Sequence, residues 1–138
     1  MKMTRLATAL AAFALATPAL ADGDIAKGEK EFGKCKACHS VEAADGTVIV
    51  KGGKTGPNLY GVIGRAAGST DFKYGSGLKE AGEKGLVWDV ETFEDYVEDP
   101  SKFIKDYTGD KAAKSNMTFK LKKGGEDIAA WLVSVSAN

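Results

Sequence analysis

Residues that bind metals or form cross-links are scarce in this sequence, which has two cysteines and one histidine among 138 residues. A structural zinc site requires four protein ligands, commonly cysteine and histidine, so these three residues do not complete one. A single histidine also excludes a site with two histidine ligands from this chain. These three residues therefore require another explanation.

Neither sign of charge dominates, because 19 basic residues balance 19 acidic ones. Two of the basic residues, Lys2 and Arg5, lie near the start, and the rest of the chain carries a small negative excess. Such a balance excludes a generally basic nucleic-acid-binding protein, although it permits local charged patches.

The sequence also lacks a long apolar segment. After a short basic start, the apolar run over residues 6–20 is shorter than the roughly 18 residues that span a bilayer. Ala19 and Ala21 supply the small residues of a signal-peptidase site. We therefore predict a cleaved signal peptide over residues 1–21, no stable membrane insertion, and one exported domain over residues 22–138.

Hydrophobic periodicity and helix caps predict an all-α fold of short helices joined by long loops. Asp24, Asp89 and Asp99 stand where helices are expected to start, and no segment shows sustained strand alternation. Helices are expected over residues 24–37, 78–84, 89–98, 99–107 and 125–134, one helical turn within 57–63, and loops over 42–57, 64–77 and 108–123. So many loops leave a small core, which favours a large buried cofactor.

Cys35, Cys38 and His39 form a Cys-x-x-Cys-His motif, the attachment pattern of c-type haem. Two thiols at this spacing can reach the two vinyl groups of one porphyrin. The following histidine is then held beneath the iron and can bind it through an imidazole nitrogen. The motif predicts one covalent haem c.

Two other uses of the cysteines are weaker. A disulfide between residues so close in sequence would restrain little of the unfolded chain, and it would leave His39 unexplained. A thioredoxin-type pair lies at a helix N-terminus, whereas this pair follows the end of an expected helix and lacks a βαβ pattern.

Met117 is the candidate for the second axial ligand, because the other two methionines lie in the predicted signal peptide. Its polar surroundings are unusual for a methionine that only fills a core. The His/Met pair is typical of cytochromes c, with a lysine or water ligand as the alternatives. Two protein ligands leave no open position for a substrate, which favours electron transfer over a haem enzyme.

Lysines gather in sequence near both candidate ligands. Basic residues near both ligands would ring the edge of a haem and could steer an acidic partner toward it. The lysines near Met117 are Lys111, Lys114, Lys120, Lys122 and Lys123, those near Cys35 are Lys34, Lys36, Lys51 and Lys54, and acids gather over residues 89–99 instead.

Several motifs together resemble class I cytochromes c, most closely the large cytochrome c2 type, over essentially all of residues 22–138. These motifs are Cys35 to His39, Thr55-Gly56-Pro57-Asn58-Leu59-Tyr60-Gly61, Gly64-Arg65, Phe72-Lys73-Tyr74, Trp88, residues 96–103 and Met117-Thr118-Phe119. Two loops, 41–55 and 104–117, are longer than in mitochondrial relatives, and Asn116 stands where a lysine is common there.

The resemblance assigns roles to further residues. It implies that the Pro57 carbonyl accepts a hydrogen bond from His39 and that Tyr96 lies near the Met117 sulfur. It implies that Arg65, Tyr74 and Trp88 contact a buried haem propionate. It also implies that Gly28 and Phe32 pack on the last helix, against Trp131.

The resemblance also implies a biological role. The expected protein is a periplasmic, monomeric one-electron carrier rather than an enzyme. Its expected donor is a membrane cytochrome bc complex, and its expected acceptor is a photosynthetic reaction centre or a terminal oxidase.

Overall fold

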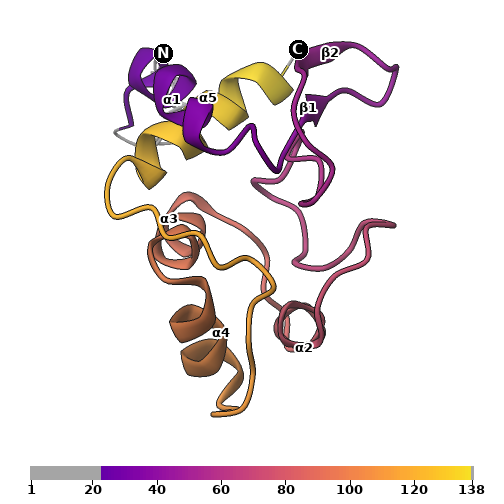
Figure 1. Cartoon of the computed structure of the whole chain (residues 1–138), viewed down its shortest axis with the longest axis vertical. Helices are drawn as coiled ribbons and strands as arrows, with labels where there is room; N and C mark the ends of the chain where they lie inside the picture. The colour runs from indigo at the N-terminus through magenta and orange to yellow at the C-terminus, as the bar shows by residue number, and fades with distance from the viewer. Residues whose placement is uncertain (1–22, 138) are drawn as a thin grey trace, which may run out of the picture.

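The computed structural model describes residues 23–137 and confirms a mainly helical fold of short helices and long connections (Figure 1). The predicted signal peptide, residues 1–21, lies outside the described residues. In chain order the elements are α1 (Ile25–Glu31), the 3₁₀ helix η1 (Phe32–Lys34), β1 (Val41–Glu42), β2 (Val48–Val50), α2 (Ser76–Glu83), α3 (Val90–Glu98), α4 (Pro100–Thr108) and α5 (Gly125–Ser136). Within residues 23–137, no helix is both long and apolar enough to cross a membrane.

The first and last helices cross in close contact, as expected (Figure 1). A Cβ atom at Gly28 would lie 2.0 Å from the Asp127 carbonyl oxygen, so only glycine permits this approach. The rings of Phe32 and Trp131 pack with their centroids 4.8 Å apart. This crossing brings the segment that carries the two cysteines next to the C-terminal helix.

Aspartate caps explain where three helices begin. The Asp24 carboxylate accepts a hydrogen bond from the Lys27 backbone N–H at the start of α1. Asp89 and Thr92 form a capping box at the start of α3, and Asp99 caps α4, whose first residue is Pro100. These starts agree with those predicted from sequence.

The first helix is shorter than predicted: α1 ends at Glu31, whereas the sequence predicts a helix to residue 37. The chain tightens into η1, and the Cys35 backbone N–H bonds the Phe32 carbonyl three residues back. Gly33, a weak helix former, lies in this tightened turn. The narrower turn presents the cysteines at the end of the helix.

A small antiparallel hairpin occupies part of the segment predicted to be a loop. Val41 pairs with Val50, and Glu42 pairs with Val48. Gly46, with a φ of 88°, permits the tight turn between them, and the β-branched residues of β2 favour an extended backbone. No helix forms within residues 57–63, where one helical turn was expected. The segment is irregular except for turns, one of them closed by the Val62 N–H on the Leu59 carbonyl at 3.2 Å.

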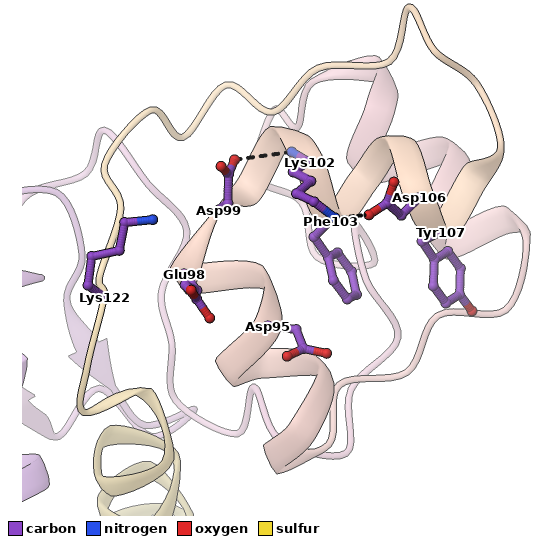
Figure 2. Close-up of a pocket in the computed structure, with 8 residues that line it drawn as sticks. All are labelled: Asp95, Glu98, Asp99, Lys102, Phe103, Asp106, Tyr107 and Lys122. Atoms are coloured by element: carbon purple, nitrogen blue, oxygen red, sulfur yellow. Dashed lines mark hydrogen bonds and ion pairs between the residues drawn. The ribbon is translucent and has the colours of Figure 1, made fainter.

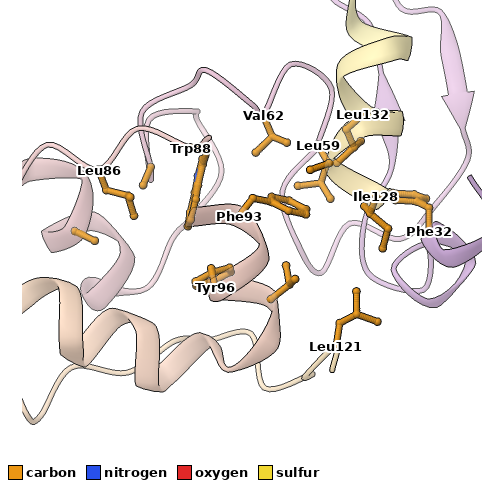
Figure 3. Packing of buried hydrophobic residues seen from close by; sticks show 14 of the residues in the cluster. Phe32, Leu59, Val62, Leu86, Trp88, Phe93, Tyr96, Leu121, Ile128 and Leu132 are labelled. Carbon is orange, nitrogen blue, oxygen red and sulfur yellow. The ribbon is translucent and has the colours of Figure 1, made fainter. Parts of the chain in front are cut away.

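The core lies between α1, α3 and α5 and continues toward α4 (Figure 3). Trp88 and Tyr96 pack with ring centroids 5.0 Å apart, and the Phe103 ring lies 5.9 Å from the Tyr96 ring. Cys35 and Met117, which are far apart in sequence, both pack against the same buried cluster. The fold therefore places both halves of the predicted site on one core.

Candidate functional site

Cys35 and Cys38 lie on the turn that follows η1 and do not form a disulfide. Cys35 is partly buried and Cys38 is exposed. Burial raises the pKa of the Cys35 thiol to about 11, so a thiol at this position is protonated at neutral pH. The thiolate form of Cys35, which disulfide exchange at this position would need, is therefore disfavoured.

His39 is held in one orientation. Its Nδ1–H donates to the Pro57 carbonyl oxygen at 2.7 Å, the hydrogen bond that the resemblance implied. Because Nδ1 carries the proton, Nε2 has the lone pair that can bind a metal. Burial lowers the pKa of His39, which favours the neutral imidazole that a metal requires. The His39 ring thus has the orientation and the protonation state that metal binding through Nε2 requires.

Gly56 leaves room for the His39 ring. A Cβ atom at position 56 would lie 2.3 Å from His39 Cε1, a distance that no side chain tolerates. The Gly56 N–H donates to the Cys38 carbonyl at 2.8 Å, and the Leu59 N–H donates to the Ser40 carbonyl at 3.1 Å. These backbone bonds lie on either side of Pro57 and fix its carbonyl beside the ring.

Asn58 ties the same segment to the hairpin. Its side chain accepts from the Glu42 N–H at 3.0 Å and donates to the Glu42 carbonyl at 2.7 Å. The side-chain amide therefore pairs with Glu42 as a neighbouring strand would. Sequence reasoning placed Asn58 in a motif but gave it no role, because the pairing depends on the unexpected hairpin.

Met117 lies in a segment, residues 109–124, that has no helix or strand. Its backbone N–H donates to Ser115 Oγ at 3.1 Å, and this hydroxyl lies 2.8 Å from the Tyr96 hydroxyl. Burial raises the pKa of Tyr96, which keeps its hydroxyl protonated. Tyr96 thus contacts the methionine loop through Ser115, which sequence analysis missed. A serine two residues before the methionine was the available signal.

Arg65 interacts with Tyr74 through its side chain and with Trp88 through its backbone. The Arg65 guanidinium donates to the carbonyls of Tyr60 and Asn58, each at 3.2 Å. Burial lowers the pKa of Arg65, and the nearby Tyr74 hydroxyl opposes this shift. The Trp88 backbone N–H donates to the Arg65 carbonyl at 3.0 Å. The structure therefore places the half-buried guanidinium beside the Tyr74 hydroxyl and links Trp88 to Arg65 through the backbone.

A basic groove runs between α1 and the segment before α5. Phe119 lies in this groove with 46% of its surface exposed. Four of the lysines predicted to surround the ligands line it, together with two on α1 that were not predicted. The groove is lined by Lys27, Lys30, Lys34, Phe119, Lys120, Leu121, Lys122 and Lys123, with Glu31, Gly124 and Asp127. The spacing of Lys27 and Lys30 puts them on one helix face with Lys34, and this could have indicated both as part of the basic surface.

The remaining predicted lysines, Lys36, Lys51, Lys54, Lys111 and Lys114, are exposed but do not line the basic groove. The acids expected over residues 89–99 gather on α3 and at the start of α4. A second groove there contains Asp95, Glu98 and Asp99 with the stacked rings of Phe103 and Tyr107 (Figure 2). Lys102 and Asp106 also line this second groove, and Lys122 lines both grooves, so the acidic groove adjoins the basic one.

Comparison with curated proteins gives the decisive observation. The chain is 57% identical over 137 residues to cytochrome c-551 of Roseobacter denitrificans, covering 99% of both chains. It is also 57% identical over 136 residues to cytochrome c2 of Rhodobacter capsulatus, covering 98% of both. This chain belongs to the cytochrome c2 and c-550 family. No protein-family model matches it.

Solved structures of this family share the fold. The crystal structure of cytochrome c2 from Rhodobacter capsulatus matches with a TM-score of 0.80 and 59% identity, covering 82% of this chain and 98% of that one. The structure of cytochrome c2 from Paracoccus denitrificans matches with a TM-score of 0.81 and 54% identity, covering 84% and 98%. Cytochromes c2 and c-550 are electron-transfer proteins rather than enzymes, and family membership implies a covalent haem c.

Proposed function

We propose that this cytochrome carries single electrons in the periplasm through one haem c that is attached to Cys35 and Cys38. His39 Nε2 and the Met117 sulfur would hold its iron. The observation that carries this proposal is the His39 ring, which is buried, bonded through Nδ1 to Pro57 and packed against Gly56. That arrangement suits a metal-binding imidazole.

The residues of the site are suited to hold a haem. When bound, haem supplies a reversible Fe(III)/Fe(II) couple, and a thioether ligand raises its reduction potential. Arg65, Tyr74 and Trp88 supply a cation and donors for a buried carboxylate, which would otherwise be costly to desolvate. Tyr96 and Ser115 hold the methionine loop. With His39 and Met117 both holding the iron, the protein would move electrons and would leave no position at the metal for a substrate.

The proposed partners are those that the family resemblance implies, and we propose the basic groove as the surface that meets them. A membrane cytochrome bc complex is the donor, and a photosynthetic reaction centre or terminal oxidase is the acceptor. Lysines around the exposed Phe119 ring attract an acidic surface and orient it, while the ring gives an apolar contact at the centre. Export by the signal peptide, residues 1–21, and action as a monomer complete the proposal.

Reversing two charges in the basic groove tests the docking surface. Lys120 already pairs with Asp99, so the better variant is Lys122→Glu with Lys123→Glu. We expect its second-order rate with a purified cytochrome bc complex to fall at least tenfold at low ionic strength and its salt dependence to flatten. Stopped-flow absorbance measures both quantities.

The matched control is Lys79→Glu with Lys105→Glu, which makes the same change in net charge outside the groove. Its rate should stay close to that of the unchanged protein. Equal slowing by both variants would show that only net charge matters and would refute the groove as the docking surface.

A further inference from the structure

The segment that carries Met117 has no regular structure of its own, so contacts with other elements must set its position. Two of these contacts come from the first turn of α4, and they lie on either side of Met117. The Ser115 backbone N–H, two residues before the methionine, donates to Ser101 Oγ at 3.1 Å. Lys120, three residues after it, pairs with the Asp99 carboxylate at 2.7 Å.

The helix turn that makes these contacts is itself well fixed. One Asp99 oxygen caps α4 by accepting from the Lys102 N–H at 3.2 Å, and the other accepts from Lys120 (Figure 2 shows the cap). Pro100 is buried at the first helical position, and Ile104 is fully buried one turn later. Ser101 and Asp99 therefore project from a rigid support.

Ser115 connects this support to the methionine. Its backbone is held by Ser101, and its hydroxyl accepts from the Met117 N–H at 3.1 Å while contacting the Tyr96 hydroxyl. A displacement of Ser115 would therefore be transmitted to Met117. Lys120 restrains the loop on the other side of the methionine through an exposed pair, so its contribution is the smaller one.

We propose that Ser101 and Asp99 are positioning residues for the second axial ligand. Together they form a latch, the first turn of α4, which holds the loop on both sides of Met117. This inference rests on the proposed ligation by Met117. Neither residue touches the haem iron in this role, and both act through the loop.

In the ferric holoprotein, the rate at which added imidazole displaces Met117 from the iron measures how firmly the latch holds the loop. The replacement of methionine by imidazole is monitored through the loss of the weak far-red sulfur-to-iron band. We expect Ser101→Ala to accelerate exchange roughly three- to tenfold, the effect of one hydrogen bond. Asp99→Asn keeps a capping side chain and should accelerate it about two- to fivefold. High salt should remove the second effect and leave the first.

Two matched controls separate positioning from general damage. Ser69→Ala removes a hydroxyl that bonds the Ala66 carbonyl, away from the methionine loop. Asp106→Asn breaks a pair with Lys102 that lies entirely within α4 (Figure 2). Both should exchange at the rate of the unchanged protein. Equal acceleration in the controls and the test variants would overturn the latch.

Amide hydrogen exchange gives a readout that does not require methionine ligation. Ser101→Ala should increase the exchange of the Ser115 amide several-fold because its acceptor is removed, and that of the Met117 amide because its acceptor, Ser115 Oγ, is held less firmly. A missing sulfur-to-iron band in the unchanged protein would refute the proposed ligation, while this measurement would still decide the latch. Unchanged amide exchange in Ser101→Ala would refute the latch alone.

Discussion

Replacing Met117 with alanine should abolish the sulfur-to-iron band and lower the reduction potential by on the order of 0.2 V, a part of the roughly 0.8 V range that axial ligands set. The thioether favours Fe(II), and water or a nearby lysine that replaces it does so less. Visible spectra and potentiometric titration of the purified holoprotein measure the two quantities.

Thr118→Ala is the control for this variant, because Thr118 is exposed beside Met117 and has no proposed role. It should keep both the band and the potential. If the unchanged protein lacked the band and Met117→Ala kept the potential, Met117 would not be the second ligand, and a lysine of residues 109–124 or water would take its place. Such a result would leave the haem attachment intact and would make a haem enzyme a viable hypothesis again.

Replacing Gly56 with alanine should damage the opposite side of the site. The new methyl group would lie 2.3 Å from His39 Cε1, so the ring must move and its 2.7 Å hydrogen bond to Pro57 must weaken. We expect the free energy of unfolding of the holoprotein to fall by about 2–3 kcal/mol, the combined effect of overpacking and a lost hydrogen bond. Guanidinium unfolding followed by absorbance measures it.

Gly33→Ala provides the comparison, because a Cβ atom there meets nothing within 4 Å. Alanine also favours a helical turn over glycine, so this variant should be neutral or slightly more stable. Equal stability of the Gly56→Ala and Gly33→Ala proteins would mean that the His39 ring is free to move. The proposed orientation of the first axial ligand would then be wrong.

Local signals in the sequence were enough for most of the helices. Asp89 and Asp99 mark two helix starts through interactions within one helical turn, and the structure has both as caps. The part of Thr92 in the first cap was not predicted. The hairpin was missed because β1 contains only two residues and its pairing depends on the turn at Gly46. Short strands leave too little alternation for a period to be seen.

The residues of the candidate site also divide into those that local sequence predicts and those that depend on the fold. The motif at Cys35, Cys38 and His39 was readable because its spacing carries the chemistry. Ser115, Ser101 and Asn58 were not, since each acts through partners that only the fold brings close. The pairing of Lys120 with Asp99, 21 residues apart, was also beyond a reading of charge along the chain.

The most direct test of the central claim is the visible spectrum of the purified protein, oxidised and reduced, after production with the haem-attachment machinery. We expect sharp reduced bands of a c-type haem and a weak far-red sulfur-to-iron band in the oxidised state. Haem bands without the sulfur band would contradict ligation by Met117. A protein without haem bands would contradict the attachment of haem at Cys35 and Cys38, and with it the proposed function.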